Sequence, residues 1–301
     1  MSADDFFGPW EGARITSWGG AVRAVEEVIN QAGSRTLAWR GQVNADWNLH
    51  SGLYRRLPGA DGVAPAPTED ALLAMESRIF EYVRSRWRFD HMPYLQLLAQ
   101  LQHFRAPTRM LDVSLSPFVG LWFAVEKQFG TDDHADGRVF AFDVSNREIG
   151  LRTKWSDYEI PWKNDAVGTP WCFELPLFWR PPAYNERIPA QHSGFLLAGV
   201  PKYRGGANAQ YRKAPGTSGE FWRIDDVRHA TCVPTRLVGR ERNAQERSEP
   251  TFTLRIAARA KEEIRDRLEK HYGINPATMY PDAFGMAKET RDAIDHGLLN
   301  A

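Results

Sequence analysis

The sequence predicts one α+β domain built around an antiparallel or mixed sheet. Segments with helical periodicity and segments with strand periodicity follow one another without the regular strand–helix–strand alternation of a parallel sheet. The 301 residues contain no internal repeat, low-complexity tract or long linker, so we treat residues 1–301 as a single domain. Hydrophobic residues make up 43% and charged residues 25% of the chain, which is typical of a globular protein with a large core.

The first half of the chain contains two helices with clear start signals. One is predicted over about residues 17–32, where Thr16 or Ser17 can cap the start, apolar residues recur at helical spacing, and Gly33 suits the C-terminal end. The other begins after Thr68, whose hydroxyl can cap the helix and which is followed by two acidic residues that favour the positive end of the helix dipole.

Two further helices flank a polar segment in the middle of the chain. Pro93 starts the first, which carries an apolar stripe and ends before Pro107. The second opens with Ser116 as its cap and Pro117 at its first position. It continues to Gly130, and its apolar composition predicts nearly complete burial.

Strands are predicted where short apolar runs lie between turn signals. These runs are residues 36–40, 139–144, 194–198, 220–224 and 251–256. The C-terminal residues 257–296 are predicted to be helical, with an amphipathic helix closed by Gly273 and a break at Pro281 in the tail.

Charge and targeting signals indicate a cytoplasmic protein without membrane contact. The 38 basic and 38 acidic side chains create no global field that would attract nucleic acid or an anionic membrane. The chain has no run of about 18 apolar residues, and its acidic start differs from a signal peptide. Cys172 and Cys232 form no CxxC pair and lie beside no histidine at a zinc-ligand spacing, so we expect no metal site.

The common catalytic signatures are missing from the sequence. It contains no Walker loop, GxGxxG, GxSxG or HExxH motif. Three segments nevertheless hold more polar residues at strand ends and turns than a core requires. They are residues 39–42 (WRGQ), 102–114 (QHFRAPTRMLDVS) and 185–195 (NERIPAQHSGF). We expect the functional site to be formed by these segments.

These segments resemble the signature of the FRG domain family, which is named for an aromatic–Arg–Gly start. WRGQ is followed by Trp47, Leu49 and the run Gly52–Arg56, as at the opening of the family. The block QHFRAPTRMLDVSLSPFVGLWFAV is similar to the family's longest motif. NERIPAQHSGF and residues 274–285 also fit, so the resemblance spans about residues 37–287. The family resemblance by itself implies little chemistry.

A more distant resemblance is to the arginine class of ADP-ribosyltransferases. That class has a strand ending in Arg-Gly, a Ser/Thr-bearing turn before an apolar helix, and a polar motif on a later strand. The resemblance implies a split antiparallel or mixed sheet flanked by helices. It also implies that Arg40 holds the phosphates of NAD, that Ser114 or Ser116 orders the nicotinamide-ribose pocket, and that Gln191 belongs to the third motif. Prokaryotic members look like toxins or antiviral, phage-defence effectors.

The third motif departs from that class, because Gln191 stands where a glutamate is expected. Cleavage of the nicotinamide glycosidic bond builds positive charge at the ribose carbon, which a carboxylate stabilises better than an amide. Glu174, Glu186 or Asp112 is an alternative source of this negative charge. The other possibility is that the fold binds its ligand without transfer.

The residue types of the first and third segments suit a ligand pocket. Arg40 offers a planar fork for phosphate, Gly41 permits close approach of the backbone, and Gln42 is a further cofactor contact. Gln191 either reads a base or ribose hydroxyl, in room left by Gly194, or is a buried amide that bonds strand backbone.

The middle segment supplies the remaining candidates. Thr108, Arg109 and Asp112 are expected to contact the cofactor, although Arg109 can instead form a buried ion pair with Asp112 that fixes the turn. His103 is either a general base or a helix-end histidine bonded to a carbonyl. Ser116 serves mainly as a helix cap, so Ser114 is the better candidate for a pocket hydroxyl.

We therefore expect an enzyme that uses NAD as a substrate and transfers ADP-ribose to a protein or a nucleic acid. Its catalytic residues are expected to be Arg40, His103, Ser114 and Gln191. One alternative is a nucleotide or nucleic-acid binding module without catalysis. Another is a nuclease or phosphotransferase that acts through His103 and Arg109, in which carboxylates such as Asp112 would hold any metal.

Overall fold

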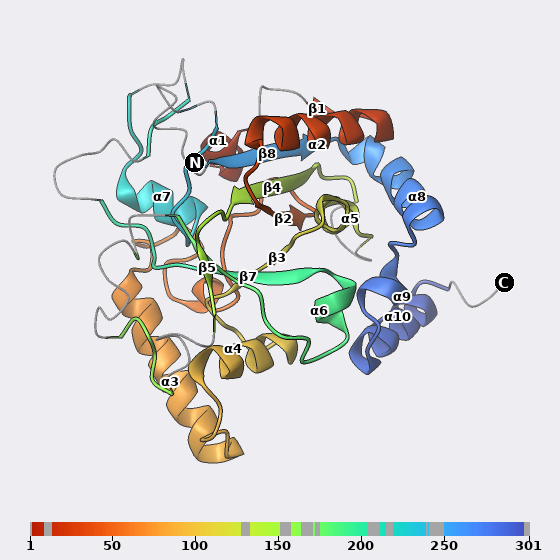
Figure 1. The fold of residues 1–301 in the computed structure, drawn as a ribbon. Coiled ribbons are helices and arrows are strands. Elements are labelled where there is room, and N and C mark those ends of the chain that lie inside the picture. Colours follow the sequence, from red (N-terminus) through yellow and green to blue (C-terminus); the bar gives the residue numbers. More distant parts are fainter. Residues whose placement is uncertain are drawn as a thin grey trace.

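The structure is a computed structural model that describes residues 2–8, 14–127, 133–150, 158–163, 171, 175–203, 211–214, 219–238, 240 and 250–297 (Figure 1). Its strands are β1 (Arg14–Ile15), β2 (Leu37–Gln42), β3 (Leu111–Ser114), β4 (Gly137–Asp143), β5 (Glu148–Ile149), β6 (Leu177–Trp179), β7 (Ser193–Leu197) and β8 (Thr251–Ile256).

The helices of the same residues lie around these strands. They are α1 (Ala3–Phe7), α2 (Trp18–Ala32), α3 (Glu69–Trp87), α4 (Tyr94–His103), α5 (Pro117–Val125), α6 (Arg187–Ala190), α7 (Ile224–Ala230), α8 (Lys261–Tyr272), α9 (Pro276–Met279) and α10 (Ala283–Asp295), with short 3-10 helices η2 (Tyr54–Arg56) and η5 (Ala258–Ala260). Among the residues described, none of these helices is both long and apolar enough to cross a membrane.

The eight strands of the described residues form one mixed sheet in the order β1-β8-β4-β2-β3-β7-β6-β5. The two edge pairs, β1–β8 and β6–β5, are parallel, and the pairs between them are antiparallel. The predicted α+β class, with a mixed sheet flanked by helices, is confirmed.

Strand β4 lies in the interior of the sheet and is buried along its whole length. Its side chains alternate between the two faces, as strand geometry requires. Val139 and Ala141 pack into the core formed with α2, α5 and α8. Phe140 and Phe142 pack on the opposite face, in the core that includes α1 and α7. In Figure 1, α2 and α8 accordingly lie along one side of the sheet, and α3 and α4 cover its far end.

Helix α5 packs unusually close to β2. Its start follows the sequence signals, since the Ser116 hydroxyl accepts from the Val119 N–H and Pro117 is the first helical residue. A Cβ on Gly41 would lie 2.2 Å from the carbonyl oxygen of Gly120, and a Cβ on Gly120 would lie 2.7 Å from the Cβ of Trp39. Two glycines therefore set the distance between this helix and this strand.

The sheet opens between β2 and β3. Strand β2 pairs with β4 along its whole length, from Leu37 to Gln42, but it pairs with β3 only where Trp39 faces Ser114. Strand β3 instead continues its pairing with β7. The two strands therefore diverge after Trp39, and the sheet is split at this point.

Two predicted elements differ from the structure. The strand predicted at residues 220–224 is wrong, because Ile224 begins α7, and Asp225 and Asp226 favour the positive end of its dipole. The helix predicted to reach Gly130 ends at Val125, where the backbone of the next residue turns to an extended ψ of 132°. The predicted break at Pro281 separates α9 from α10 and is confirmed.

Candidate functional site

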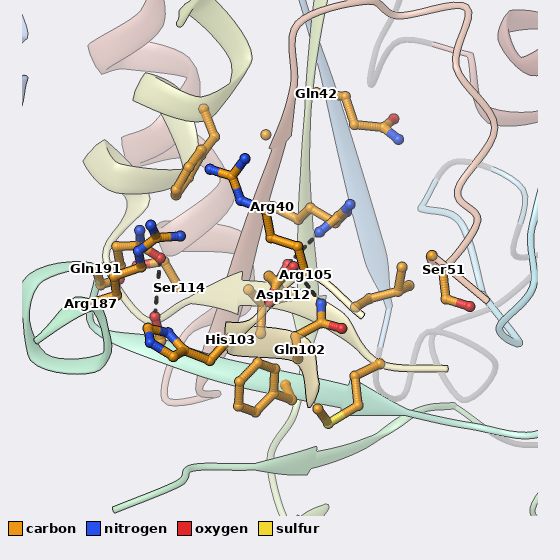
Figure 2. Close-up of a pocket in the computed structure, with 18 of the residues that line it drawn as sticks. Arg40, Gln42, Ser51, Gln102, His103, Arg105, Asp112, Ser114, Arg187 and Gln191 are labelled. Atoms are coloured by element: carbon orange, nitrogen blue, oxygen red, sulfur yellow. Dashed lines mark hydrogen bonds between the residues drawn. The ribbon is translucent and has the colours of Figure 1, made fainter. Parts of the chain in front are cut away.

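A cavity of about 490 Å³ lies where the sheet splits (Figure 2). Its walls come from β2, the loop between β2 and η2, the ends of α4 and α5, strand β3, the α6–β7 segment, and Tyr280 after α9. Arg40, Ser114 and Gln191, which come from the three polar segments of the sequence, all line this cavity.

Arg40 lies at the centre of the cavity. Its Nη1 donates to the backbone carbonyl of Asp112 at 2.6 Å, and its Nε is buried without a hydrogen-bond partner in the described residues. Burial lowers the pKa of Arg40; the Asp112 carboxylate opposes this shift, and the positive charge of Arg55 adds to it. Two guanidinium groups therefore lie near each other without a carboxylate that neutralises both.

Four further arginines line the cavity. Arg187 forms a bidentate ion pair with Asp282. Arg55 donates from Nη1 to the His50 carbonyl at 3.1 Å, and Arg56 donates from Nη1 to the Gly52 carbonyl at 2.7 Å. Four cavity arginines form no ion pair within the described residues: Arg40, Arg55, Arg56 and Arg105.

Two carboxylates, Asp112 and Glu126, line the same cavity as these cations. Asp112 is exposed, and its Oδ2 accepts from Nε2 of Gln102 at 2.9 Å. Glu126 is 8% exposed, and its two oxygens accept from the Tyr280 hydroxyl at 3.0 and 3.2 Å. Burial and the charge of Glu126 raise the pKa of Tyr280 well above its usual value, so this phenol remains a donor.

The other carboxylates considered from the sequence do not line the cavity. Glu186 is exposed at the start of α6, outside the cavity wall, and Glu174 lies outside the described residues. In the part of the chain that the structure describes, no group of three or more His, Cys, Asp or Glu side chains is arranged to hold a metal ion.

Ser114 and Gln191 are joined to each other on the β3–β7 side of the split. The Ser114 hydroxyl donates to the backbone carbonyl of Gln191 at 2.7 Å and accepts from the Ser116 N–H at 3.0 Å. The Gln191 side chain donates from Nε2 to the Met279 carbonyl at 2.7 Å. These groups hold the wall together as well as lining it.

His103 and Gln42 also lie where the sequence analysis expected a pocket. His103 is the last residue of α4; burial lowers its pKa, the positive charge of Arg187 adds to that shift, and Asp282 opposes it. The ring is therefore mainly neutral near pH 7. Gln42 donates from Nε2 to the Asn48 carbonyl at 3.2 Å, and its Oε1 is buried without a partner among the described residues.

Arg109 and Thr108 do not line the cavity, which corrects the expected cofactor contacts. The Arg109 side chain is fully buried, with Nε 2.8 Å from Glu76 Oε1 and Nη1 3.0 Å from Glu69 Oε1. The predicted ion pair between Arg109 and Asp112 is wrong, because the two carboxylates that pair with Arg109 both come from α3. Thr108 is 1% exposed, and its hydroxyl bonds Gln102 and the Met110 N–H.

The two glycines expected to leave room for a ligand have packing roles instead. Gly41 is required by the contact with α5 described above. A Cβ on Gly194 would lie 2.2 Å from the Phe178 ring, so the expected space beside Gln191 is filled. The open space lies on the Arg40 side of the wall.

Sequence reasoning assigned no role to several groups in this cavity. Arg55 and Arg56 form an adjacent basic pair in the run that follows WRGQ. This pair is the sequence feature that indicates their place in the cavity. Glu126 directly follows the apolar helix, and Tyr280 lies in the C-terminal segment. Nothing local in the sequence indicates that these last two residues meet, because 154 positions separate them.

The comparisons with known proteins agree with the placement of the first two motifs, at residues 39–42 and 102–114. Residues 35–133 match the family model of the FRG domain. A search of the curated proteins and of the solved structures found no match. The matched residues include β2, η2, α4, β3 and α5, which supply Arg40, Arg55, Asp112 and Glu126 to the cavity. Residues 35–133 therefore match the FRG domain, and the rest of the chain lies outside this match.

Proposed function

We propose that the cavity binds NAD and that the protein transfers ADP-ribose from it to a macromolecular acceptor. The observation that carries this proposal is the set of four cavity arginines without an ion-pair partner in the described residues. Four guanidinium groups against the two carboxylates of the cavity, Asp112 and Glu126, favour a ligand with several negative charges. The volume of about 490 Å³ lies in the range of cofactor-sized sites.

Arg40 is the residue that binds the diphosphate in this proposal. Its buried Nε and its neighbour Arg55 leave N–H donors and positive charge at the centre of the cavity. A diphosphate supplies two negative charges and several acceptor oxygens, so it relieves the repulsion between the two guanidinium groups. Dinucleotides place a nucleoside on each side of such a group.

The wall formed by Ser114, Gln191 and Glu126 is the side assigned to the nicotinamide ribose. In the transfer, the bond between ribose C1′ and the nicotinamide nitrogen breaks, and nicotinamide leaves with the electron pair. The acceptor oxygen or nitrogen bonds to C1′ and releases its proton. Glu126, oriented by Tyr280, supplies the carboxylate that stabilises the positive charge at C1′ in place of the missing third-motif glutamate.

His103 is assigned as the base that accepts the acceptor's proton. A histidine whose pKa is lowered is neutral near pH 7 and so has a lone pair available. It lines the cavity on the same side as Arg187 and Gln191 in Figure 2. The acceptor, whether protein or nucleic acid, would approach from this side.

A second candidate function is nucleotide binding without transfer. It is favoured by the hydrogen bonds of Ser114 and Gln191, because the Ser114 proton and the Gln191 amide nitrogen are already used by backbone carbonyls. These groups then stabilise the wall, and the cavity binds a nucleotide without cleaving it.

The test is to incubate the protein with NAD labelled in its adenylate half, together with protein and nucleic-acid acceptors. Three quantities are measured: NAD binding by calorimetry, nicotinamide release, and label transfer. Arg40→Ala should abolish binding. Glu126→Gln retains an acceptor for the Tyr280 hydroxyl and should keep binding while losing release. Arg86→Ala, an exposed arginine on α3, is the matched control and should change neither.

The outcomes separate the candidates. Binding with nicotinamide release that depends on Glu126 supports transfer. Binding that depends on Arg40, with no release in the wild-type protein, supports the binding module. The absence of NAD binding, or equal binding by the wild-type protein and Arg40→Ala, overturns the assignment of the cavity.

A further inference from the structure

The end of the cavity formed by the loop after β2 has more positive charge than a diphosphate needs. Trp47, Arg55 and Arg56 line this end. In Figure 2, Ser51 of the same loop lies on the opposite side of Arg40 from Ser114 and Gln191. The proposed function assigns the nicotinamide ribose to the Ser114 side, so the other nucleoside of a dinucleotide lies toward this loop.

The backbone of this loop is held rigidly, and the side chains of Arg55 and Arg56 are exposed on it. Tyr54 is fully buried, and its hydroxyl bonds the Pro67 carbonyl at 3.1 Å and the Arg228 carbonyl at 3.0 Å. The Leu53 N–H donates to the Thr108 carbonyl at 2.9 Å. A preformed arrangement favours binding because less side-chain and loop freedom is lost when the ligand arrives.

At this end of the cavity, the positive charge of the arginines exceeds the negative charge of a diphosphate. Arg55 lies near Arg40 and shares with it the two charges of a diphosphate. Arg56 has a single hydrogen bond in the described residues, from Nη1 to the Gly52 carbonyl, and a guanidinium has five N–H donors. Its remaining donors suit one more phosphate, which a guanidinium binds through paired hydrogen bonds.

The same end offers a surface for a base. Trp47 is 40% exposed although tryptophan is usually mostly buried, and it lines the cavity. An exposed indole in a cavity that arginines also line is the combination on which a nucleobase stacks while its phosphate is neutralised. His50 is neutral at physiological pH, because burial lowers its pKa to about 4, so it adds no positive charge to that of the arginines.

We propose that the preferred ligand is a dinucleotide with a phosphate monoester on its adenosine ribose, as in NADP, and that Arg56 binds this phosphate while Trp47 stacks on the adenine. This inference rests on the proposed function, because it uses Arg40 as the diphosphate site. It assigns Arg56 to ligand choice and leaves Arg40 responsible for binding either nucleotide.

Calorimetric titration of the full-length protein with NADP and, separately, with NAD tests the inference. The wild-type protein should bind NADP about tenfold more tightly, the size of one charge-assisted contact. Arg56→Gln should bring the two affinities to within about twofold by weakening NADP alone, and Arg56→Lys should restore part of the preference. Trp47→Leu should weaken both nucleotides and leave their ratio unchanged.

Arg86→Gln serves as the charge-matched control and should leave both affinities unchanged. Equal affinity of the wild-type protein for NAD and NADP overturns this inference and leaves the proposed function standing. An equal loss of NADP affinity in Arg86→Gln and Arg56→Gln also overturns it, since general electrostatics would then be the cause. If neither nucleotide binds, the proposed function fails, and this inference fails with it.

Discussion

The hydrogen atom that serves as the side chain of Gly41 determines how close α5 can lie to β2. The ideal Cβ position is 2.2 Å from the Gly120 carbonyl oxygen and 2.3 Å from the Ala124 nitrogen, and both atoms belong to backbone that is fixed by helix hydrogen bonds. A methyl group here has to push the helix away, and the cavity wall moves with it.

Gly41→Ala is therefore expected to destabilise the protein by about 2–3 kcal/mol, as overpacking of a core does. Urea unfolding followed by circular dichroism measures the free energy of unfolding. Gly150→Ala is the matched control, because nothing lies within 4 Å of a Cβ at that position. Equal stability of the two variants would show that α5 has room beside β2.

His50 makes the stability depend on pH. Its ring is 3% exposed and Nε2 bonds the Arg228 carbonyl at 3.0 Å, and burial lowers its pKa to about 4. Because the folded-state pKa is below the unfolded value of about 6.5, the unfolded chain binds more protons between these values. Stability is therefore fully present above pH 6.5 and is lost as the pH falls toward 4.

This shift should remove about 2 kcal/mol of stability between pH 7.5 and pH 5. His50→Gln keeps a donor for the Arg228 carbonyl but does not titrate there. We expect urea unfolding at the two pH values to show a smaller pH-dependent loss in His50→Gln than in the wild-type protein. The same loss in both proteins would assign the effect to other groups.

At the scale of elements, the C-terminal helices α9 and α10 close one wall of the cavity. Asp282 pairs with Arg187 of α6, and its side chain also accepts from the Gly285 N–H at 2.9 Å as the cap of α10. Gln191 bonds the Met279 carbonyl, and Glu126 bonds the Tyr280 hydroxyl. The segment is thus attached to α6 and α5 by polar contacts and, through Met279 and the Tyr280 ring, by apolar packing.

Asp282→Asn removes the ion pair and retains a capping oxygen. We expect about tenfold faster hydrogen exchange over residues 276–295, because a partly buried charge-assisted contact is lost. The melting temperature of the rest of the protein should change little. Exchange monitored by mass spectrometry reports this segment directly. Asp292→Asn, which breaks only the surface pair with Lys288, should leave the exchange unchanged, and equal acceleration would contradict the docking role.

The sequence predicts elements well where the signal is local. Ser17, Thr68 and Ser116 cap the helices that they were expected to start, because each hydroxyl meets a backbone N–H three residues ahead. Strand β3 (Leu111–Ser114) was missed because two of its four residues, Asp112 and Ser114, are polar and the surrounding segment has the composition of a turn. Its strand character comes from pairing with β7, more than 70 residues away.

The composition of the cavity was less predictable because its contacts are long-range. Arg40, Ser114 and Gln191 were expected together from a family resemblance, and they do line one cavity. Arg109 was assigned a possible contact with its near neighbour, whereas its partners lie 33 and 40 residues earlier on α3. Spacing along the chain does not reveal such partners; only the packing of α3 behind β3 and β7 brings them together.

For the whole molecule, the balance of 38 basic and 38 acidic side chains hides an uneven distribution. Some buried or half-buried cations elsewhere in the described structure have carboxylate partners, as Arg138 and Arg255 have in Asp4. In the cavity, Arg40, Arg55 and Arg56 donate to backbone carbonyls instead. A small anion should therefore bind at the cavity and stabilise the fold, although no net charge attracts it from a distance.

Inorganic pyrophosphate tests this directly. At about ten times its dissociation constant, binding to the folded state contributes about 1.4 kcal/mol, which corresponds to a rise of about 2 °C in melting temperature for a chain of 301 residues. Sulfate at the same ionic strength has one tetrahedral centre instead of two linked ones and should stabilise the protein less.

The rise in melting temperature should disappear in Arg40→Ala and persist in Arg86→Ala. A rise that survives in Arg40→Ala would place the anion elsewhere, and equal stabilisation by sulfate would show that the cavity does not distinguish a diphosphate.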